Sequence, residues 1–254
     1  MTVVVAYKYA ANPQDASVAA DGNVNWSRAK STVSEYDPVA IQLGRDLADA
    51  SGAELVGVSV GAKDAASSMA KKNALSKGLD RAVVVADGDA PTWNATKVAS
   101  ALAELVKGVD GADILLTGDS SVDEGARIVS ALAAGYLGWP CFQGVASVAK
   151  TAEGYEITQN VPGGTRTVAV SGPVVVAAAP DAVTPKVPSM KEILAAGKKP
   201  FATAEVSPAD VEVTVTGRAK PDSKARKNQI LAGPDGPADR RTAVRRRALR
   251  AERK

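Results

Sequence analysis

The amino-acid sequence predicts an α/β fold with a doubly wound, mostly parallel sheet, extended by antiparallel strands and by a C-terminal arm. Apolar, β-branched runs alternate four times with segments of helical spacing before residue 140. This alternation is typical of parallel strands joined by helices that cover both faces of a sheet. After residue 140 the strand-like runs are separated only by glycine-bearing turns, which predicts antiparallel pairing. The 254 residues suffice for one large domain with an appendage.

Four pairs of strand and helix account for the first part of the chain. Asp37 and Pro38 suit the N-cap and the first turn of the first helix, and Gly52 suits its end. Thr92 suits the cap of the third helix. The polar stretch before the first helix has room for a short edge hairpin around residues 24–26. We expect strands at residues 2–7, 54–60, 81–85 and 114–117, and helices at residues 37–50, 64–77, 92–107 and 123–137.

The chain after residue 140 is expected to add the remaining strands of the sheet and then to continue as a short helix and an extended arm. The apolar run at residues 174–178 predicts a strand that rejoins the main sheet, and residues 189–196 predict one short helix. A further edge strand is expected at residues 211–215. The other expected strands are at residues 145–148, 155–161 and 165–170. We therefore divide the chain into an α/β domain (1–200), an extended arm (201–239) and a basic tail (240–254).

Two compositional absences exclude whole classes of chemistry. The chain has no histidine, which excludes a Ser–His–Asp triad, a histidine base and a histidine metal site. Its single cysteine, Cys141, excludes an internal disulfide, a structural zinc cluster and an iron–sulfur centre held by this chain alone. We therefore expect no catalytic constellation and no metal, and any redox chemistry would need a bound organic cofactor.

The net charge of +3 is unevenly distributed. Residues 240–254 hold eight basic residues and one acidic residue, or +7, so the other 239 residues carry −4. The charge density of such a tail permits binding to nucleic acid or to an anionic membrane surface. Because no aromatic residue is interleaved for base stacking, a solubilising tail or an arm on a partner is favoured, and no nucleic acid is expected. No apolar run reaches the roughly 18 residues of a membrane span, and no signal peptide precedes the first strand, so we expect cytoplasmic residence.

The turn after the fourth strand is the candidate binding site. Backbone N–H groups of residues 122–125, at the expected helix start, are placed to hold phosphate oxygens. Gly118 and Gly125 permit close backbone approach, and Asp119 suits ribose hydroxyls. Ser120, Ser121 and Arg127 are further possible donors to a phosphate.

Simpler interpretations of these and neighbouring residues remain open. Ser121 or Asp123 can merely cap the fourth helix, with Asp123 and Glu124 complementing its dipole. Lys8 follows the first strand and can reach a phosphate, although a lone lysine there is more often solvated. Tyr36 and Asp37 can flank an adenine or simply form a helix cap with a packed aromatic residue.

Five motifs stand in a characteristic order: SEYDPVAIQ at residues 34–42, VSVG at 58–61, LSKGLDRAVVV at 75–85, GDSSVDEGARIVSALAAGYLGWP at 118–140 and VPSMKEILAAGKKP at 187–200. Together they resemble the β subunit of electron-transfer flavoproteins, most closely the FixA-like branch, over about residues 2–207. The resemblance implies a Rossmann-like, adenine nucleotide alpha-hydrolase-like fold. It also implies a heterodimer with an α subunit that chiefly holds an FAD, while the β site holds AMP or a second FAD. Residues 201–239 would contact the α subunit.

The resemblance assigns cofactor contacts to positions after the first, second and fourth strands and before the first helix. With their neighbours Tyr7 and Lys8, the predicted cofactor-binding residues are Ala6, Tyr7, Lys8, Ser34, Tyr36, Asp37, Val60, Gly118, Asp119, Ser120, Ser121, Val122, Asp123, Glu124, Gly125, Ala126, Arg127, Ile128 and Val129.

The resemblance also implies a docking segment. In the family that this chain resembles, the residue that matches Val187 is exposed and apolar and inserts into a partner protein. The resemblance implies that the partner is a flavin dehydrogenase or a quinone-linked oxidoreductase. Met190 would add to that anchor, and the basic Lys186, Lys191, Lys198 and Lys199 would suit an acidic partner. The alternative is a capped surface helix with solvated lysines.

Three functional hypotheses follow. The first is an electron-carrier subunit, which is not an enzyme by itself. The second is an electron-bifurcating subunit whose own FAD oxidises NADH. The third, a stand-alone nucleotide-binding regulator or an ATP-using ligase, is disfavoured because the chain lacks a Walker-type phosphate loop.

Overall fold

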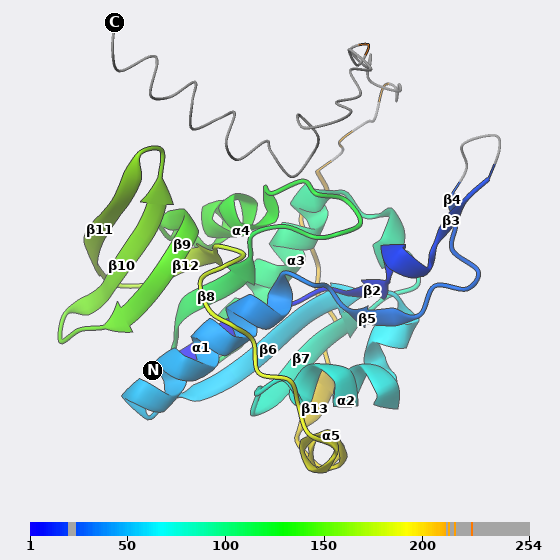
Figure 1. Cartoon of the computed structure of the whole chain (residues 1–254), viewed down its shortest axis with the longest axis horizontal. Helices are drawn as coiled ribbons and strands as arrows, with labels where there is room; N and C mark the ends of the chain where they lie inside the picture. Colours follow the sequence, from blue (N-terminus) through cyan, green and yellow to red (C-terminus); the bar gives the residue numbers. More distant parts are fainter. Residues whose placement is uncertain (20–23, 212, 214–215, 217–224, 226–254) are drawn as a thin grey trace, which may run out of the picture. The chain divides into compact units, whose positions relative to one another are not determined.

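The fold is organised around a nine-stranded sheet (Figure 1). The computed structural model describes residues 1–19, 24–211, 213, 216 and 225. In spatial order the strands are β11 (Gly164–Ser171), β10 (Gly154–Val161), β9 (Cys141–Lys150), β12 (Val174–Ala178), β8 (Ala112–Gly118), β1 (Thr2–Ala6), β6 (Glu54–Gly61), β7 (Arg81–Ala86) and β13 (Phe201–Thr203).

Parallel pairing runs from β9 through β12, β8, β1, β6 and β7 to β13. Val3, Val4 and Val5 at the centre of the sheet are fully buried, as expected for a strand covered on both faces. Strands β9, β10 and β11 pair in antiparallel fashion. The predicted α/β fold, its four alternations and the return of residues 174–178 to the main sheet are confirmed.

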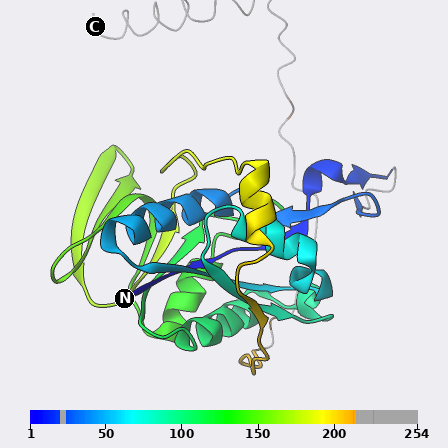
Figure 2. The same ribbon diagram turned by 90° about the horizontal axis from the view of Figure 1, so that it is seen from below.

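Helices cover both faces of the sheet. Figure 2 shows α1 (Asp37–Ser51) on one side of the sheet and α3 (Ala95–Lys107) on the other. Helix α2 (Ser68–Leu75) shares the apolar core of α1, whereas α4 (Val129–Leu137) packs beside α3. The short helix α5 (Met190–Ala196) contacts α2. The core is thus split into two layers by the sheet.

Short elements fill the connections. Strand β2 (Tyr9–Ala11) pairs with β5 (Ser31–Val33), and β3 (Ser17–Val18) pairs with β4 (Val24–Asn25), which confirms a hairpin near residue 24. The 3-10 turns are η1 (Pro13–Asp15), η2 (Lys63–Ala66) and η3 (Ala90–Thr92).

Several predicted boundaries of helices are wrong. Asp37 is the first residue of α1 and not its N-cap, because its side chain binds a backbone group of another segment. The second predicted helix is divided into η2 and α2. The third begins at Ala95, where Asn94 accepts a hydrogen bond from the Lys97 N–H and replaces Thr92 as the cap. The fourth begins at residue 129 instead of 123.

The C-terminal segment joins the sheet before it leaves the described region. Strand β13 pairs with β7, and Asn94 donates to the Val211 carbonyl. Met1–Val213 forms one compact unit, so the predicted boundary after residue 200 falls inside it. Residues 211 and 213 are not in a strand, and the rest of the predicted strand at 211–215 lies outside the described residues. So do most of the arm and the whole basic tail.

Candidate functional site

A cavity of about 410 Å³ lies at the carboxyl edge of the parallel strands. The chain moves from β1 to β6 and β7 on one side, and then returns to place β8 on the other side of β1. Such a reversal of strand order leaves a crevice at the carboxyl ends of the two strands. The volume lies within the range of small-molecule and cofactor sites.

Most of the residues predicted to bind a cofactor lie in the wall of this cavity. They come from three strand ends, the start of α1 and the loop after β8: Ala6, Tyr7, Lys8, Asp37, Val60, Gly118, Asp119, Ser120, Ser121, Asp123, Glu124, Ala126, Arg127 and Val129. Ser34 and Val122 instead line a much smaller neighbouring cavity. Tyr36, Gly125 and Ile128 are in neither wall.

The sequence interpretation missed the far end of the cavity. Gly61 is the last residue of β6 and Ala62 follows it, whereas Pro91 and Trp93 lie after β7. Val98 and Leu102 of α3 add further apolar wall; the full set of missed residues also contains Tyr9, Ala10, Ala11, Ser31, Asp64, Ala90, Ala95, Thr117 and Ser130. The sequence could have indicated these residues, because the turns after all parallel strands lie at the same carboxyl edge of the sheet.

Asp37 joins the ends of β1 and β8 at the base of the cavity. The backbone N–H of Lys8 donates to Asp37 Oδ2 at 2.7 Å. On the other side, a Cβ added to Gly118 would lie 2.7 Å from Asp37 Oδ1 and 2.9 Å from the Tyr36 Cβ. Only glycine therefore lets β8 end this close to the start of α1, so Gly118 has a packing role whether or not a ligand is bound.

Burial perturbs the ionisation of Asp37. Its side chain is 5% exposed, and burial raises the pKa of this carboxyl to about 7, against the opposing effect of the Lys8 N–H and ammonium. Burial and the nearby Asp37 raise the pKa of the Tyr7 phenol. Asp37 therefore titrates near neutral pH, unlike an ordinary aspartate.

The loop of residues 119–128 is not the start of a helix. Gly125 and Arg127 have φ angles of 63° and 57°, in the left-handed region, which interrupts a right-handed helix. Helix α4 has Ile128 at its N-cap, with no side-chain cap. Both predictions for residues 121–125, a phosphate-binding helix start and a simple helix cap, are therefore wrong in their geometry.

Asp123 instead binds Lys8 across the mouth of the crevice. Lys8 Nζ lies 2.6 Å from Asp123 Oδ2 and 3.7 Å from Glu124 Oε1. Burial opposes ionisation of Asp123, but the hydrogen bond and charge of Lys8 lower the pKa of this carboxyl below its usual value. Lys8 is thus a paired cation in the site, with 35% of its side chain exposed.

Arg127 is the second cation of the site. Its guanidinium lies 3.1 Å from Asp119 Oδ2, and the Asp119 side chain is 14% exposed. Asp119 therefore holds an arginine in this structure. The start of α4 adjoins Arg127 along the cavity wall, and the first N–H groups of a helix have no partner within the helix. This end of the cavity suits a phosphate group.

Three further features concern the single thiol, the acidic side chains and the helices of the described residues. Burial raises the pKa of the Cys141 thiol, which disfavours a reactive thiolate. No cluster of three or more acidic or cysteine side chains is arranged to hold a metal ion among these residues. None of the helices within this part combines the length and apolarity needed to cross a membrane.

The predicted docking segment forms an exposed apolar patch on residues 187–194. Val187, Met190 and Leu194 are 86%, 71% and 63% exposed. The backbone N–H of Lys186 donates to Gln42 Oε1, and its ammonium group forms an ion pair with Glu192. Ser189 and Glu192 form a capping box that begins α5.

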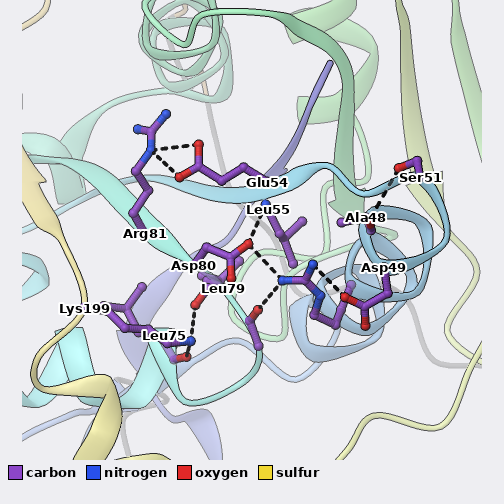
Figure 3. Close-up of polar contacts among 12 residues, drawn as sticks. Ala48, Asp49, Ser51, Glu54, Leu55, Leu75, Leu79, Asp80, Arg81 and Lys199 are labelled. Atoms are coloured by element: carbon purple, nitrogen blue, oxygen red, sulfur yellow. Dashed lines mark hydrogen bonds and ion pairs between the residues drawn. The ribbon is translucent and has the colours of Figure 1, made fainter.

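Lys199 anchors the other end of the docking segment. Figure 3 shows its ammonium turned toward the backbone carbonyl groups of Leu75 and Leu79, at 3.3 and 2.5 Å. Burial lowers the pKa of this lysine. The ion pair of Arg45 and Asp80 lies close enough to influence the charge of Lys199. Four lysines were predicted to face a partner. Lys186 and Lys199 bind groups of this chain, as described above, whereas Lys191 and Lys198 are exposed.

A comparison with protein families completes the description of the site. A family model described as "Electron transfer flavoprotein domain" matches residues 22–209. The matched region contains α1, the loop of residues 119–128 and the docking segment.

Proposed function

Since the chain belongs to the electron transfer flavoprotein family, we propose that it is the β-type subunit of a heterodimer. In this proposal it holds an adenine nucleotide in the cavity between β1 and β8. It passes electrons between a flavin dehydrogenase or quinone-linked oxidoreductase and an FAD held with an α subunit. The single observation that carries the proposal is the cavity of about 410 Å³ at the reversal of strand order.

The residues present fit an adenine nucleotide. Lys8, Arg127 and the start of α4 supply positive charge and N–H donors for phosphate oxygens. A bound phosphate would compete with Asp123 and Asp119 for these two cations. The nucleotide would thus span the loop and the strand ends.

A bound flavin would supply the electron-accepting ring, which the single cysteine of this chain cannot replace because a dithiol–disulfide pair needs two thiols. The contribution of the protein is then placement. The rigid parallel sheet fixes the nucleotide, and the exposed patch of residues 187–194 gives a partner a defined place to dock.

Replacing Val187 with aspartate is expected to slow electron transfer to a partner dehydrogenase about tenfold at limiting partner concentration, because a central apolar anchor is typically worth more than 1 kcal/mol. Flavin content and unfolding free energy should not change, since this side chain is 86% exposed. Stopped-flow flavin reduction by the partner measures the rate. Val18→Asp, at another exposed valine, is the control, and equal rates for both variants would contradict the docking role.

The electron-bifurcating hypothesis has one observation in its favour. The cavity continues past Val60 to an apolar end formed by Pro91, Trp93, Val98 and Leu102. An aromatic and aliphatic wall of this kind suits a second planar ring. This end favours a bound FAD over AMP, and an FAD in this site would allow the subunit to oxidise NADH.

Acid extraction of the purified complex tests the proposed function. One flavin and one AMP per heterodimer would support the carrier, whereas two flavins, bleached by NADH, would support the bifurcating subunit. A complex that contains no adenine nucleotide bound by this chain would overturn the proposal. Gly118→Val, which crowds the base of the cavity, should lose the extracted nucleotide of the β site specifically.

A further inference from the structure

A chain of hydrogen bonds connects the outermost strand of the sheet to the binding loop. Arg166 Nε on β11 donates to Gln159 Oε1 on β10 at 2.9 Å. Gln159 Nε2 donates to the backbone carbonyl of Gln143 on β9 at 2.7 Å. The Gln143 side-chain amide then donates to the Arg127 carbonyl and to Ser130 Oγ, both at 3.1 Å. Each strand of the antiparallel extension therefore contributes one member.

The two residues that accept hydrogen bonds from the Gln143 side chain, Arg127 and Ser130, both lie where the binding loop meets α4. Arg127 is the one non-glycine residue with positive φ in the described part of the chain. For such a residue the left-handed region costs about 1–2 kcal/mol. A strained backbone persists only when its surroundings hold it. Ser130 lies at the start of α4 and in the cavity wall. Gln143 thus holds the last turn of the loop against the first turn of the helix.

The side chain of Arg127 is fixed separately. Asp119, at the other end of the loop, binds its guanidinium at 3.1 Å. The loop is therefore closed by one contact on the Arg127 side chain and one on its carbonyl group. Of these two contacts, only the hydrogen bond from Gln143 to the Arg127 carbonyl comes from outside the loop. Gln159 is buried, so the orientation of the β9 backbone at Gln143 is itself held by a shielded hydrogen bond.

We propose that Gln143 is a positioning residue for the binding site, and that Gln159 and Arg166 hold it in place. By fixing the Arg127 carbonyl and Ser130, it keeps the loop of residues 119–128 and the start of α4 in the arrangement that receives the phosphate. The inference rests on the proposed nucleotide-binding function. It gives the antiparallel strands β9, β10 and β11, which have no residue of the predicted site, a role in that function.

Hydrogen exchange and nucleotide binding of the full chain test this role. Gln143→Met keeps the length of the side chain and removes its donor. Amides of residues 119–131 should exchange about tenfold faster in the nucleotide-free variant, and AMP or FAD should bind about tenfold more weakly, which corresponds to about 1.4 kcal/mol. Ser147→Ala, at an exposed position of the same strand, is the matched control and should change neither quantity.

A second pair of variants separates positioning from general destabilisation. In an Arg127→Gly background the left-handed backbone is no longer strained, so Gln143→Met should have a smaller effect on exchange of the loop. In an Arg127→Ala background the strain remains and the effect should persist. Equal effects in both backgrounds, or unchanged loop exchange in Gln143→Met, would overturn the proposal. Wild-type protein without nucleotide binding would overturn the proposed function alone, because the exchange is measured without nucleotide.

Discussion

Lowering the pH from 8 to 5 is expected to raise the free energy of unfolding by roughly 2–3 kcal/mol through Asp37 alone, since one pKa unit corresponds to about 1.36 kcal/mol. Burial raises the pKa of Asp37 to about 7 in the folded chain, whereas an unfolded aspartate titrates near 3.9. Between these two values the folded state holds a proton that the unfolded state has released. Lower pH therefore favours folding. The stabilisation is complete below about pH 4 and is lost as the pH rises through 7.

Urea unfolding of the wild type and of Asp37→Asn between pH 5 and 8 measures this contribution. Asparagine keeps an acceptor for the Lys8 N–H but has no proton to release. The difference in unfolding free energy between the two proteins should therefore change by roughly 2–3 kcal/mol across the window. Asp181→Asn, at an exposed position, serves as the control. Parallel curves for the wild type and Asp37→Asn would show that Asp37 is ionised like a surface carboxylate.

Replacing Gly118 with alanine is expected to cost roughly 1–3 kcal/mol of stability, as overpacking of a dense interior commonly does. The new Cβ would lie 2.7 Å from Asp37 Oδ1 and 3.0 Å from the Tyr36 carbonyl carbon. The second atom belongs to the backbone, so relief requires the start of α1 to move away from β8. Because this movement displaces the base of the cavity, bound adenine nucleotide should also fall.

Gly135→Ala in α4 is the matched control for Gly118→Ala. A Cβ at Gly135 meets nothing within 4 Å, and alanine is favoured over glycine in a helix by roughly 0.5–1 kcal/mol. This variant should be as stable as the wild type or slightly more stable, with unchanged nucleotide content. Urea unfolding and acid extraction measure both quantities. Equal stability of the two variants would contradict the packing role of Gly118.

Periodicity and turn residues in the sequence were sufficient to predict the main sheet. The apolar runs that begin at Thr2, Glu54 and Arg81 became β1, β6 and β7, because a strand covered on both faces must be apolar throughout. The order of five motifs predicted the electron transfer flavoprotein family, which the family model confirms. Assignment to the β subunit and to the FixA-like branch stays a prediction.

The geometry of the loop after β8 could not be predicted in the same way. Local signals at Ser121 and Asp123 favour a helix start, but Asp123 binds Lys8, which lies far away in the sequence. The carbonyl group of Arg127, whose backbone is in the left-handed region, accepts a hydrogen bond from Gln143 of β9. Such contacts exist only after distant strands have paired. The sequence therefore predicted which residues lie in the cavity wall more readily than how they are arranged there.

The placement of β1 has a consequence for the order of events during synthesis. Thr2 pairs with Glu54 on one side and with Ala112 on the other. A nascent chain can pair β1 with β6, and β6 with β7, before β8 is synthesised, but the second edge of β1 is covered only once β8 has left the ribosome. The crevice between β1 and β8 is consequently assembled late, after the half of the sheet that supports it.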